Sequence, residues 1–301
     1  MERTEVTYPL TAPTASVGAQ KGARRMLEVI DKGSCSQAHP TPLLFVHGSW
    51  HAAWCWDEHF LNFFADKGYH AVALSLRGHG ASPGRQRLRW TRLQDYVADI
   101  AKTAAQLPTP PVLVGHSMGG FVIQKYLEHH TAAGAILVAS IPPSGVLRVT
   151  LRIARRHPVP FAKVNASLRL APLVATPELV RDLFFSASTP DEQVNAYQQR
   201  LQDEGYRGFL DMLALDLVKT KHVNRVPMLV LGAEDDNIVS QRQIRRTAAL
   251  YGAEAQIFPN MGHDVMLEPG WAAVAERIHR WLETRHLQLD DDPTGEQLAS
   301  H

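Results

Sequence analysis

The chain contains a serine, a carboxylate and a histidine in an order that could activate a hydroxyl group. The serine is Ser117, in the run Gly115-His116-Ser117-Met118-Gly119-Gly120. A serine hydroxyl becomes a strong nucleophile only when a neighbouring base takes its proton, and that base needs an acid to fix its tautomer. The spacing Gly-x-Ser-x-Gly therefore predicts an imidazole and a carboxylate further along the chain, in the order serine, acid, histidine.

The predicted base is His263, because it follows a glycine in the loop after a late strand. Two other candidates, His279 and His286, lie in or just after the terminal amphipathic segment, where surface positions are expected. The predicted acid is Asp236, which is followed by the usual run Asn-Ile-Val, and Asp235 is the alternative.

The tetrahedral intermediate of acyl transfer needs two backbone N–H donors, each worth about 2.7 to 4 kcal/mol. Met118 is predicted to supply one, because its N–H is the first of the helix after the serine. The loop after the apolar run 43–46 is predicted to supply the other through Ser49. Three neighbouring residues are pocket-lining candidates: His47, which is also expected to brace this loop, Trp50 and His116.

These residues need a sheet and helices to hold them. The apolar run 111–114 predicts a buried parallel strand and the segment after Gly120 a helix, which places Ser117 at a tight corner where flanking glycines avoid a clash. Other strands are predicted at 4–10, 25–31, 41–46, 70–76, 132–139, 226–231 and 255–258, and helices at 57–67, 93–107, 241–251 and 271–285. This alternation predicts a doubly wound, mostly parallel α/β sheet.

The alternation stops after Ser140, where helical pieces at 177–186, 191–204 and 206–218 predict a cap inserted after the sixth strand. The expected domains are a core in two parts, 1–141 and 223–286, the helical cap 142–222 and a disordered acidic tail 287–301. Within the cap, four arginines recur at helical spacing: Arg148, Arg152, Arg155 and Arg156. They indicate either a solvated basic face or contact with an anionic lipid surface or an acidic substrate group.

Composition narrows the class of protein. The chain has 301 residues, 45% of them hydrophobic, with 31 Lys and Arg against 30 Asp and Glu. This balance gives no reason to expect a nucleic-acid partner. No signal peptide or run of 18 apolar residues is evident, so a cytoplasmic protein without a transmembrane segment is expected. Two cysteines, Cys35 and Cys55, are expected to be free thiols. The sequence predicts no oligomeric state.

Together the motifs resemble those of the α/β-hydrolase superfamily over residues 25 to 286. The motifs that carry the resemblance are His47-Gly48-Ser49, Arg77-Gly78-His79-Gly80-Ala81-Ser82, Gly115 to Gly120, Asp236-Asn237-Ile238-Val239 and Gly262-His263. The run from His47 to Trp56 also looks like the oxyanion loop of the plant methylesterase and hydroxynitrile-lyase branch. The lyases carry a lysine after the catalytic histidine, and here that position is Asp264.

The resemblance implies an enzyme that forms an acyl intermediate on Ser117 and uses neither a metal nor an organic cofactor. The expected activity is a serine carboxylic-ester hydrolase for small to medium, mainly apolar esters. Epoxide hydrolases and haloalkane dehalogenases of the superfamily use an aspartate nucleophile, which disfavours both here. Thioesters, lactones and C–C bonds next to a carbonyl suit the same machinery, and a receptor-like member with little turnover is the alternative from another class.

Overall fold

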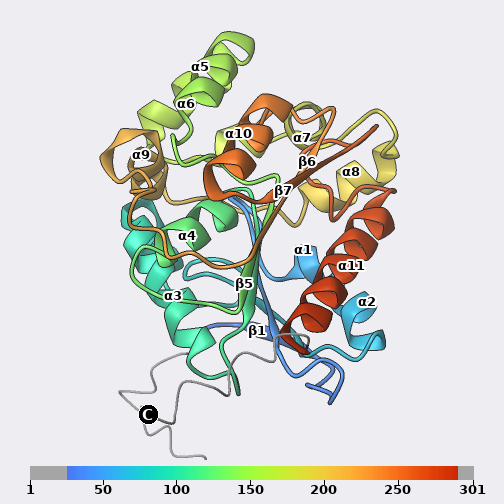
Figure 1. The fold of residues 1–301 in the computed structure, drawn as a ribbon. Coiled ribbons are helices and arrows are strands. Elements are labelled where there is room, and N and C mark those ends of the chain that lie inside the picture. The colour runs from blue at the N-terminus through green and yellow to red at the C-terminus, as the bar shows by residue number, and fades with distance from the viewer. Residues whose placement is uncertain (1–25, 291–301) are drawn as a thin grey trace, which may run out of the picture.

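The computed structural model describes residues 26–290, which form one seven-stranded sheet with helices on both faces (Figure 1). The strand order is β1-β3-β2-β4-β5-β6-β7, with β1 antiparallel to β3 and all other neighbours parallel. The strands are β1 (Val29–Lys32), β2 (Leu43–Val46), β3 (Ala71–Leu74), β4 (Val112–His116), β5 (Gly134–Val138), β6 (Met228–Ala233) and β7 (Glu254–Phe258). The doubly wound, mostly parallel α/β fold is therefore confirmed.

The central strands are buried on both faces because helices cover them. Every residue of β2 to β6 is buried, whereas the edge strands β1 and β7 are partly exposed. On one side of the sheet lie α3 (Leu93–Ala104) and α4 (Met118–Tyr126), and on the other α1 (Trp54–Asp57), α2 (Phe60–Asp66) and α11 (Trp271–Asp290) (Figure 1). Helix α10 (Gln241–Tyr251) packs against β6 and β7. The short 3-10 helix η1 (Arg85–Trp90) lies in the loop between β3 and α3.

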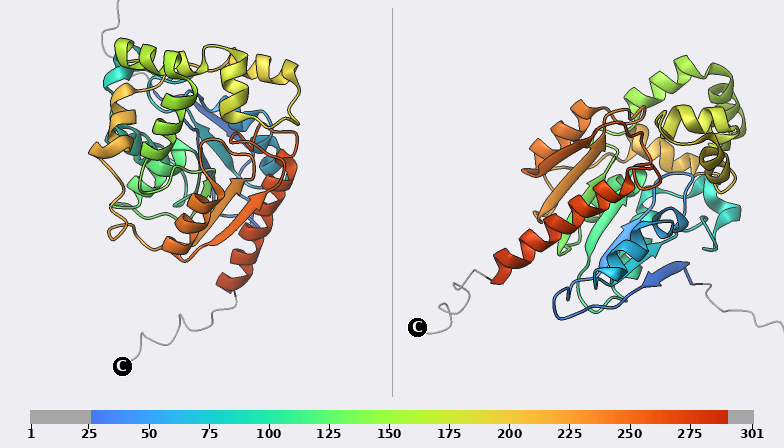
Figure 2. Two further views of the ribbon diagram at one scale, coloured as in Figure 1. Left: turned by 90° about the horizontal axis from the view of Figure 1, so that it is seen from above. Right: turned by 90° about the vertical axis from the view of Figure 1, so that its right-hand side faces the viewer.

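Between β5 and β6 the described chain forms helices only. They are α5 (Leu147–Arg156), α6 (Pro158–Ser167), η2 (Ala171–Val174), α7 (Pro177–Phe184), α8 (Asp191–Gln198), α9 (Tyr206–Leu210) and the short π-helix η3 (Asp211–Leu215). We call residues 147–215 the helical insertion. Figures 1 and 2 show it gathered at one end of the sheet. It follows the fifth described strand, because the strand predicted at 4–10 lies outside the described residues.

Several predicted helices differ from the structure, and the helix expected at 191–204 ends at Gln198. The helix expected at 57–67 is two pieces, α1 and α2, and begins earlier. The helix expected at 206–218 ends sooner, at Leu215. Helix α11 continues to Asp290, past the expected bound at 285 and into the segment 287–301 for which the sequence predicts a disordered tail. Residues 287–290 contain no proline or glycine, and such a run can extend a helix. The rest of that tail lies outside the described residues.

Two smaller expectations concern cysteines and membranes. Cys35 and Cys55 are free thiols, as predicted. Burial is the main cause that raises the pKa of Cys55 well above its usual value, so this thiol stays protonated. Within residues 26–290, no helix combines the length and apolar character that crossing a bilayer requires.

Candidate active site

Ser117 lies at the sharp corner between β4 and α4, where the chain is strained. Its backbone has φ 50° and ψ −117°, a conformation that costs a non-glycine residue about 1–3 kcal/mol. The flanking glycines make the corner possible. A Cβ at Gly115 would lie 2.5 Å from Ile123 Cδ1, and one at Gly119 would lie 2.4 Å from the carbonyl oxygen of Val46. Larger residues at either position would therefore open the corner and move Ser117.

The serine, the histidine and the aspartate singled out in the sequence meet in one chain of hydrogen bonds. His263 Nε2 lies 2.8 Å from Ser117 Oγ, and His263 Nδ1 lies 2.8 Å from Asp236 Oδ2. The second carboxylate oxygen of Asp236 accepts from the backbone N–H groups of Ile238 and Val239 at 2.7 and 2.8 Å. The alternative acid, Asp235, is exposed and does not take this place. The carboxylate is thus fixed on one side and free to orient the imidazole on the other.

The environment of His263 sets its proton affinity. Burial alone would lower the pKa of this imidazole, but the Asp236 carboxylate, assisted by Asp264, raises it above the ordinary value. An imidazole with a raised pKa is a stronger base towards the Ser117 hydroxyl, and its protonated form is stabilised by the same carboxylates. The arrangement can therefore accept and return one proton at Ser117 Oγ.

The two residues predicted to donate N–H groups, Ser49 and Met118, contact each other through their side chains. The Ser49 hydroxyl donates to Met118 Sδ at 3.3 Å, which places the loop after β2 against the start of α4. Neither Ser49 N–H nor Met118 N–H donates to another backbone carbonyl in the part of the chain that the structure describes. Trp50, the next residue, has φ 65°, so the chain turns sharply immediately after Ser49. An oxyanion formed at Ser117 would need two N–H donors of this kind.

The three pocket-lining candidates differ in position. His47 is fully buried and accepts the Leu76 N–H on Nε2 at 3.0 Å, so it braces the loop from behind. Burial lowers the pKa of His47 well below its usual value. His116 is also buried, and burial lowers its pKa to about 3. Trp50 is half-buried and donates from its indole N–H to the Leu170 carbonyl at 3.2 Å, which joins this loop to the helical insertion.

Asp264 is a site residue that the sequence motifs single out only because hydroxynitrile lyases carry a lysine at this position. Its side chain is fully buried, and Oδ2 lies 3.0 Å from His51 Nε2 while Oδ1 lies 3.5 Å from His116 Nε2. Burial would raise the pKa of this carboxyl, but the histidines around it lower the pKa below its usual value. His51 in turn lies 2.8 Å, through Nδ1, from the Ser49 carbonyl. The buried Asp264 carboxylate thus connects the loop that carries His263 to the loop that carries Ser49.

Two residues that lie in no motif, one in the helical insertion and one in the core, connect the insertion to the site. The Phe184 ring at the end of α7 lies 5.6 Å from the Trp50 ring and 6.1 Å from the His263 ring, measured between centroids. Glu268 is fully buried and accepts hydrogen bonds from Ser186 and from Gly262 N–H, the residue before His263. The contacts of the Phe184 ring and of the Glu268 carboxylate therefore depend on packing between distant segments, which sequence periodicity does not encode.

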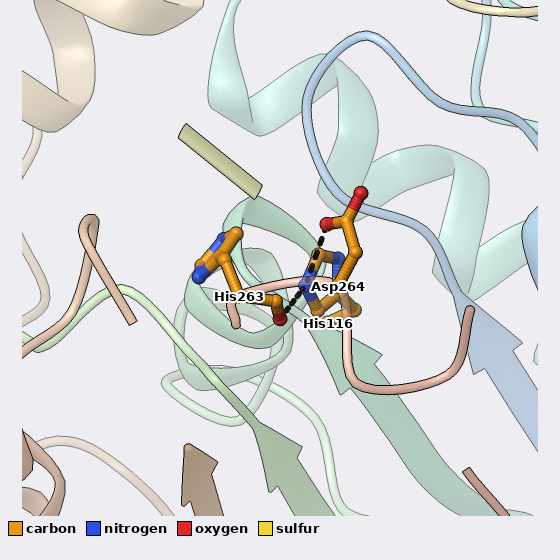
Figure 3. A group of neighbouring side chains, drawn as sticks. All are labelled: His116, His263 and Asp264. Atoms are coloured by element: carbon orange, nitrogen blue, oxygen red, sulfur yellow. Dashed lines mark hydrogen bonds and ion pairs between the residues drawn. The ribbon is translucent and has the colours of Figure 1, made fainter. Parts of the chain in front are cut away.

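One group of side chains near the site has the composition of a metal centre. His116, His263 and Asp264 bring potential ligand atoms within 4.8 Å of one another, and Figure 3 shows how they lie. Both ring nitrogens of His263 are already engaged, however, by Ser117 and Asp236. His116 Nε2 lies 3.1 Å from the His263 carbonyl, also drawn in Figure 3. A metal bound through His263 would disrupt this chain of hydrogen bonds, so the group fits a hydrogen-bonded support better than a metal centre.

Known proteins share this architecture. A family model described as the alpha/beta hydrolase family matches residues 43–277. A non-heme haloperoxidase from Rhodococcus erythropolis is 27% identical over 74% of this chain and 85% of its own. A monoacylglycerol lipase from Mycolicibacterium smegmatis is 25% identical over 75% of this chain and 82% of its own. The solved monoacylglycerol lipase of Paleococcus ferrophilus superposes with a TM-score of 0.63 at 20% identity, covering 86% of this chain and 98% of that one.

The likeness to the solved structure shows the fold, and the family model covers most of the chain, including Ser117, Asp236 and His263. The sheet order, the strained corner after β4 and the hydrogen-bonded serine agree with that match. The chain belongs to the α/β hydrolase family.

Proposed function

We propose that this hydrolase is a serine carboxylic-ester hydrolase acting on small to medium, mainly apolar esters through an acyl-enzyme intermediate. The observation that carries the proposal is the unbroken chain Ser117 Oγ, His263 and Asp236, with both links at 2.8 Å. The site has a nucleophile, a base within proton-transfer distance and an acid that orients the base. Relatives named esterase and lipase support the same reaction class.

In the proposed reaction, Ser117 Oγ attacks the ester carbonyl while His263 Nε2 takes the hydroxyl proton. Asp236 holds the imidazole in the tautomer that leaves Nε2 free to accept, and it stabilises the imidazolium that forms. The N–H groups of Ser49 and Met118 bind the developing oxyanion. His263 then gives the proton to the leaving alcohol, and a water molecule attacks the acyl group by the same path in reverse.

The preference for apolar esters rests on the side chains around the serine. Met118 begins α4 beside Ser49, and the rings of Trp50 and Phe184 pack together near His263. Aromatic and thioether side chains bind acyl or alkyl groups by removing apolar surface from water. Because Phe184 belongs to the helical insertion, we propose that this insertion acts as a cap that shapes the substrate pocket.

Hydrolysis of p-nitrophenyl acetate and butyrate tests the proposal. We expect turnover by the wild type and a loss of at least about a thousandfold in Ser117→Ala, since the nucleophile is removed. Ser167→Ala is the matched control, because it makes the same change at an exposed position on α6. Equal rates for wild type and Ser117→Ala would overturn the proposal.

A fluorophosphonate probe distinguishes the enzyme from a receptor-like member of the fold. An activated serine should be labelled in a stoichiometric burst in the wild type and not in Ser117→Ala. If the wild type is not labelled but still binds ester ligands, the receptor-like alternative is favoured. Varying acyl length separately from the leaving group then tests the expected apolar preference.

A further inference from the structure

A cavity that is not lined by Ser117 lies between the helical insertion and the core. It measures about 620 Å³ and is bounded by α5, the chain near Val218 and α10. Four arginines line it, two from each helix: Arg148, Arg152, Arg242 and Arg246. We call this cavity the arginine cleft. The stripe of arginines along α5 is thus divided, because Arg156 pairs with Asp182 instead of facing the cleft.

The positive charge of the arginine cleft is not balanced by its own walls. No aspartate or glutamate is among the described residues that line it. Asp216 precedes Leu217, which lines the cleft, but its carboxylate is paired with Lys125, whose Nζ lies 2.7 Å away. Arg152 donates to the Asn237 carbonyl at 2.6 Å, a neutral acceptor. Four guanidinium groups around one cavity repel one another unless solvent or an anion compensates them.

The other walls add hydrogen-bond donors. Ser144 and Thr220 line the cleft and carry hydroxyl groups, and Ser240 lines it as well, although its hydroxyl already donates to Gln243. Gln243 accepts from Ser240 N–H at 3.0 Å and from Ser240 Oγ at 2.9 Å, so its amide NH₂ is left as a donor. Ser240 is also the N-terminal cap of α10, an eleven-residue helix, and the partial positive charge of a helix N-terminus favours anions. The guanidinium groups, the hydroxyl groups and the N-terminus of α10 therefore all favour a negatively charged ligand.

We propose that the arginine cleft binds a multivalent oxyanion, with a phosphate group as the chemical class that fits it best. Guanidinium groups bind phosphate oxygens in pairs of parallel hydrogen bonds, and four of them suit a group that carries two or more negative charges. The volume lies within the range of small-molecule sites, so a phosphorylated small molecule or a phospholipid headgroup can enter.

The arginine cleft adjoins the segments that hold the proposed active site. Arg152 contacts the carbonyl of Asn237, the residue after Asp236. Pro142 of the cleft follows Ile141, whose N–H donates to the Ser117 carbonyl at 3.2 Å. A bound anion is therefore close to two site loops, but its binding does not depend on ester hydrolysis. Binding can be measured even if the proposed esterase activity fails.

Isothermal titration of the full chain with inorganic phosphate and with pyrophosphate, at low ionic strength, tests the proposal. We expect pyrophosphate to bind one per chain and more tightly than phosphate, because it carries more charge. In Arg148→Gln/Arg246→Gln we expect binding to weaken by at least about tenfold, since two charge-assisted contacts are lost. All four arginines are exposed, so these variants should fold, and thermal unfolding verifies this.

The matched control is Arg155→Gln/Arg245→Gln. It removes the same charge from the same two helices, at exposed residues that do not line the arginine cleft. Unchanged pyrophosphate affinity in this control, beside weakened affinity in the cleft variant, supports the proposal. Equal weakening in both variants would show general attraction to a basic surface and would overturn the proposal.

Vesicles distinguish the two sources of phosphate. If the ligand is a lipid headgroup, the chain should also sediment with phosphatidylglycerol vesicles but not with phosphatidylcholine vesicles, and the cleft variant should lose this binding. Exposed Leu147 and Leu151 on α5 would then contact the acyl chains. Pyrophosphate binding without vesicle binding identifies a soluble phosphorylated ligand. The absence of both would overturn the proposal.

Discussion

At the scale of single residues, the proton affinity of His263 is set mainly by opposing effects. Burial lowers its pKa and the Asp236 carboxylate raises it, with a net increase over the ordinary value. The base must be neutral to accept the Ser117 proton, so activity falls as pH drops through this raised pKa. Stability has the opposite sign, because a raised histidine pKa stabilises the fold below the ordinary value and this contribution is lost at higher pH.

Asp236→Asn separates orientation of the imidazole from the rest of the site. We expect kcat to fall by about 10⁴, because an amide holds the wrong tautomer. The acid limb of the pH–rate profile should also move to lower pH, because the main group that raises the pKa of His263 is removed. Asp235→Asn, in the same turn but exposed, is the control and should retain the wild-type profile. An unchanged acid limb in Asp236→Asn would contradict this assignment.

Asp264→Asn tests a positioning residue. Its carboxylate lies 3.0 Å from His51, and His51 contacts the carbonyl of Ser49. Loss of the charge should loosen the Ser49 loop, so we expect kcat to fall by about tenfold or more with little change in KM, as for a donor that acts in the transition state. The acid limb should shift slightly to lower pH, because Asp264 also raises the pKa of His263. A change in stability alone, with kcat and the profile retained, would indicate a purely structural residue.

At the scale of elements, one buried carboxylate joins the helical insertion to the loop that carries His263. Glu268 accepts from Ser186 N–H at 2.6 Å and Oγ at 2.8 Å, from Thr189 Oγ1 at 2.7 Å and from Gly262 N–H at 2.7 Å. In Glu268→Ala these buried donors lose their acceptor, at a cost of about 1–3 kcal/mol for each that stays unpaired. Urea unfolding should show a loss of at least about 3 kcal/mol. Glu276→Ala, on partly exposed α11, is the comparison and should change little.

Local patterns predicted the elements that follow local rules. Helix α10 has the predicted bounds, because its capping residue Ser240 and terminal Gly252 are both local signals. The buried strand before Ser117 and the helix after it were predicted from apolar runs and flanking glycines. Ser117, Asp236 and His263 could be selected because each lies in a recognisable motif at the end of a predicted strand or in the loop that follows one. The predicted end of α11, at residue 285, was wrong because the sequence has no local stop signal there.

The remaining site residues could not be predicted because they act across distant segments. Phe184 and Glu268 have neighbours far away in the sequence, and neither lies in a motif. The basic stripe on α5 shows the same limit. Its helical spacing was predicted, but only the packing of α5 beside α10 brings Arg148 into one cavity with Arg242.

At the scale of the whole molecule, the helical insertion is held to the core by buried polar contacts as well as by apolar packing. Glu204, between α8 and α9, lies with Oε2 3.3 Å from His79 Nε2 and accepts from Tyr96 OH at 2.7 Å. His79 belongs to the loop after β3, and Tyr96 belongs to α3. The carboxylate is buried among three segments of the chain, so its charge state should affect the stability of the whole fold.

The acid stability of the protein should therefore depend on Glu204. Burial would raise the pKa of this carboxyl, but His79 and hydrogen bonds lower it to about 2. A lowered pKa stabilises the fold above the ordinary glutamate value, and that contribution is lost as pH falls from about 4.5 towards 2. Glu204→Gln should be less stable at pH 7 by about 3 kcal/mol, because it removes one partner of a buried pair, and its stability should depend less on pH in this window.

Glu192→Gln, exposed on α8, is the matched control and should follow the wild type. Chemical unfolding at pH 7, 5, 4 and 3 measures both effects, and parallel curves for wild type and Glu204→Gln would show that this carboxylate does not link the insertion to the core.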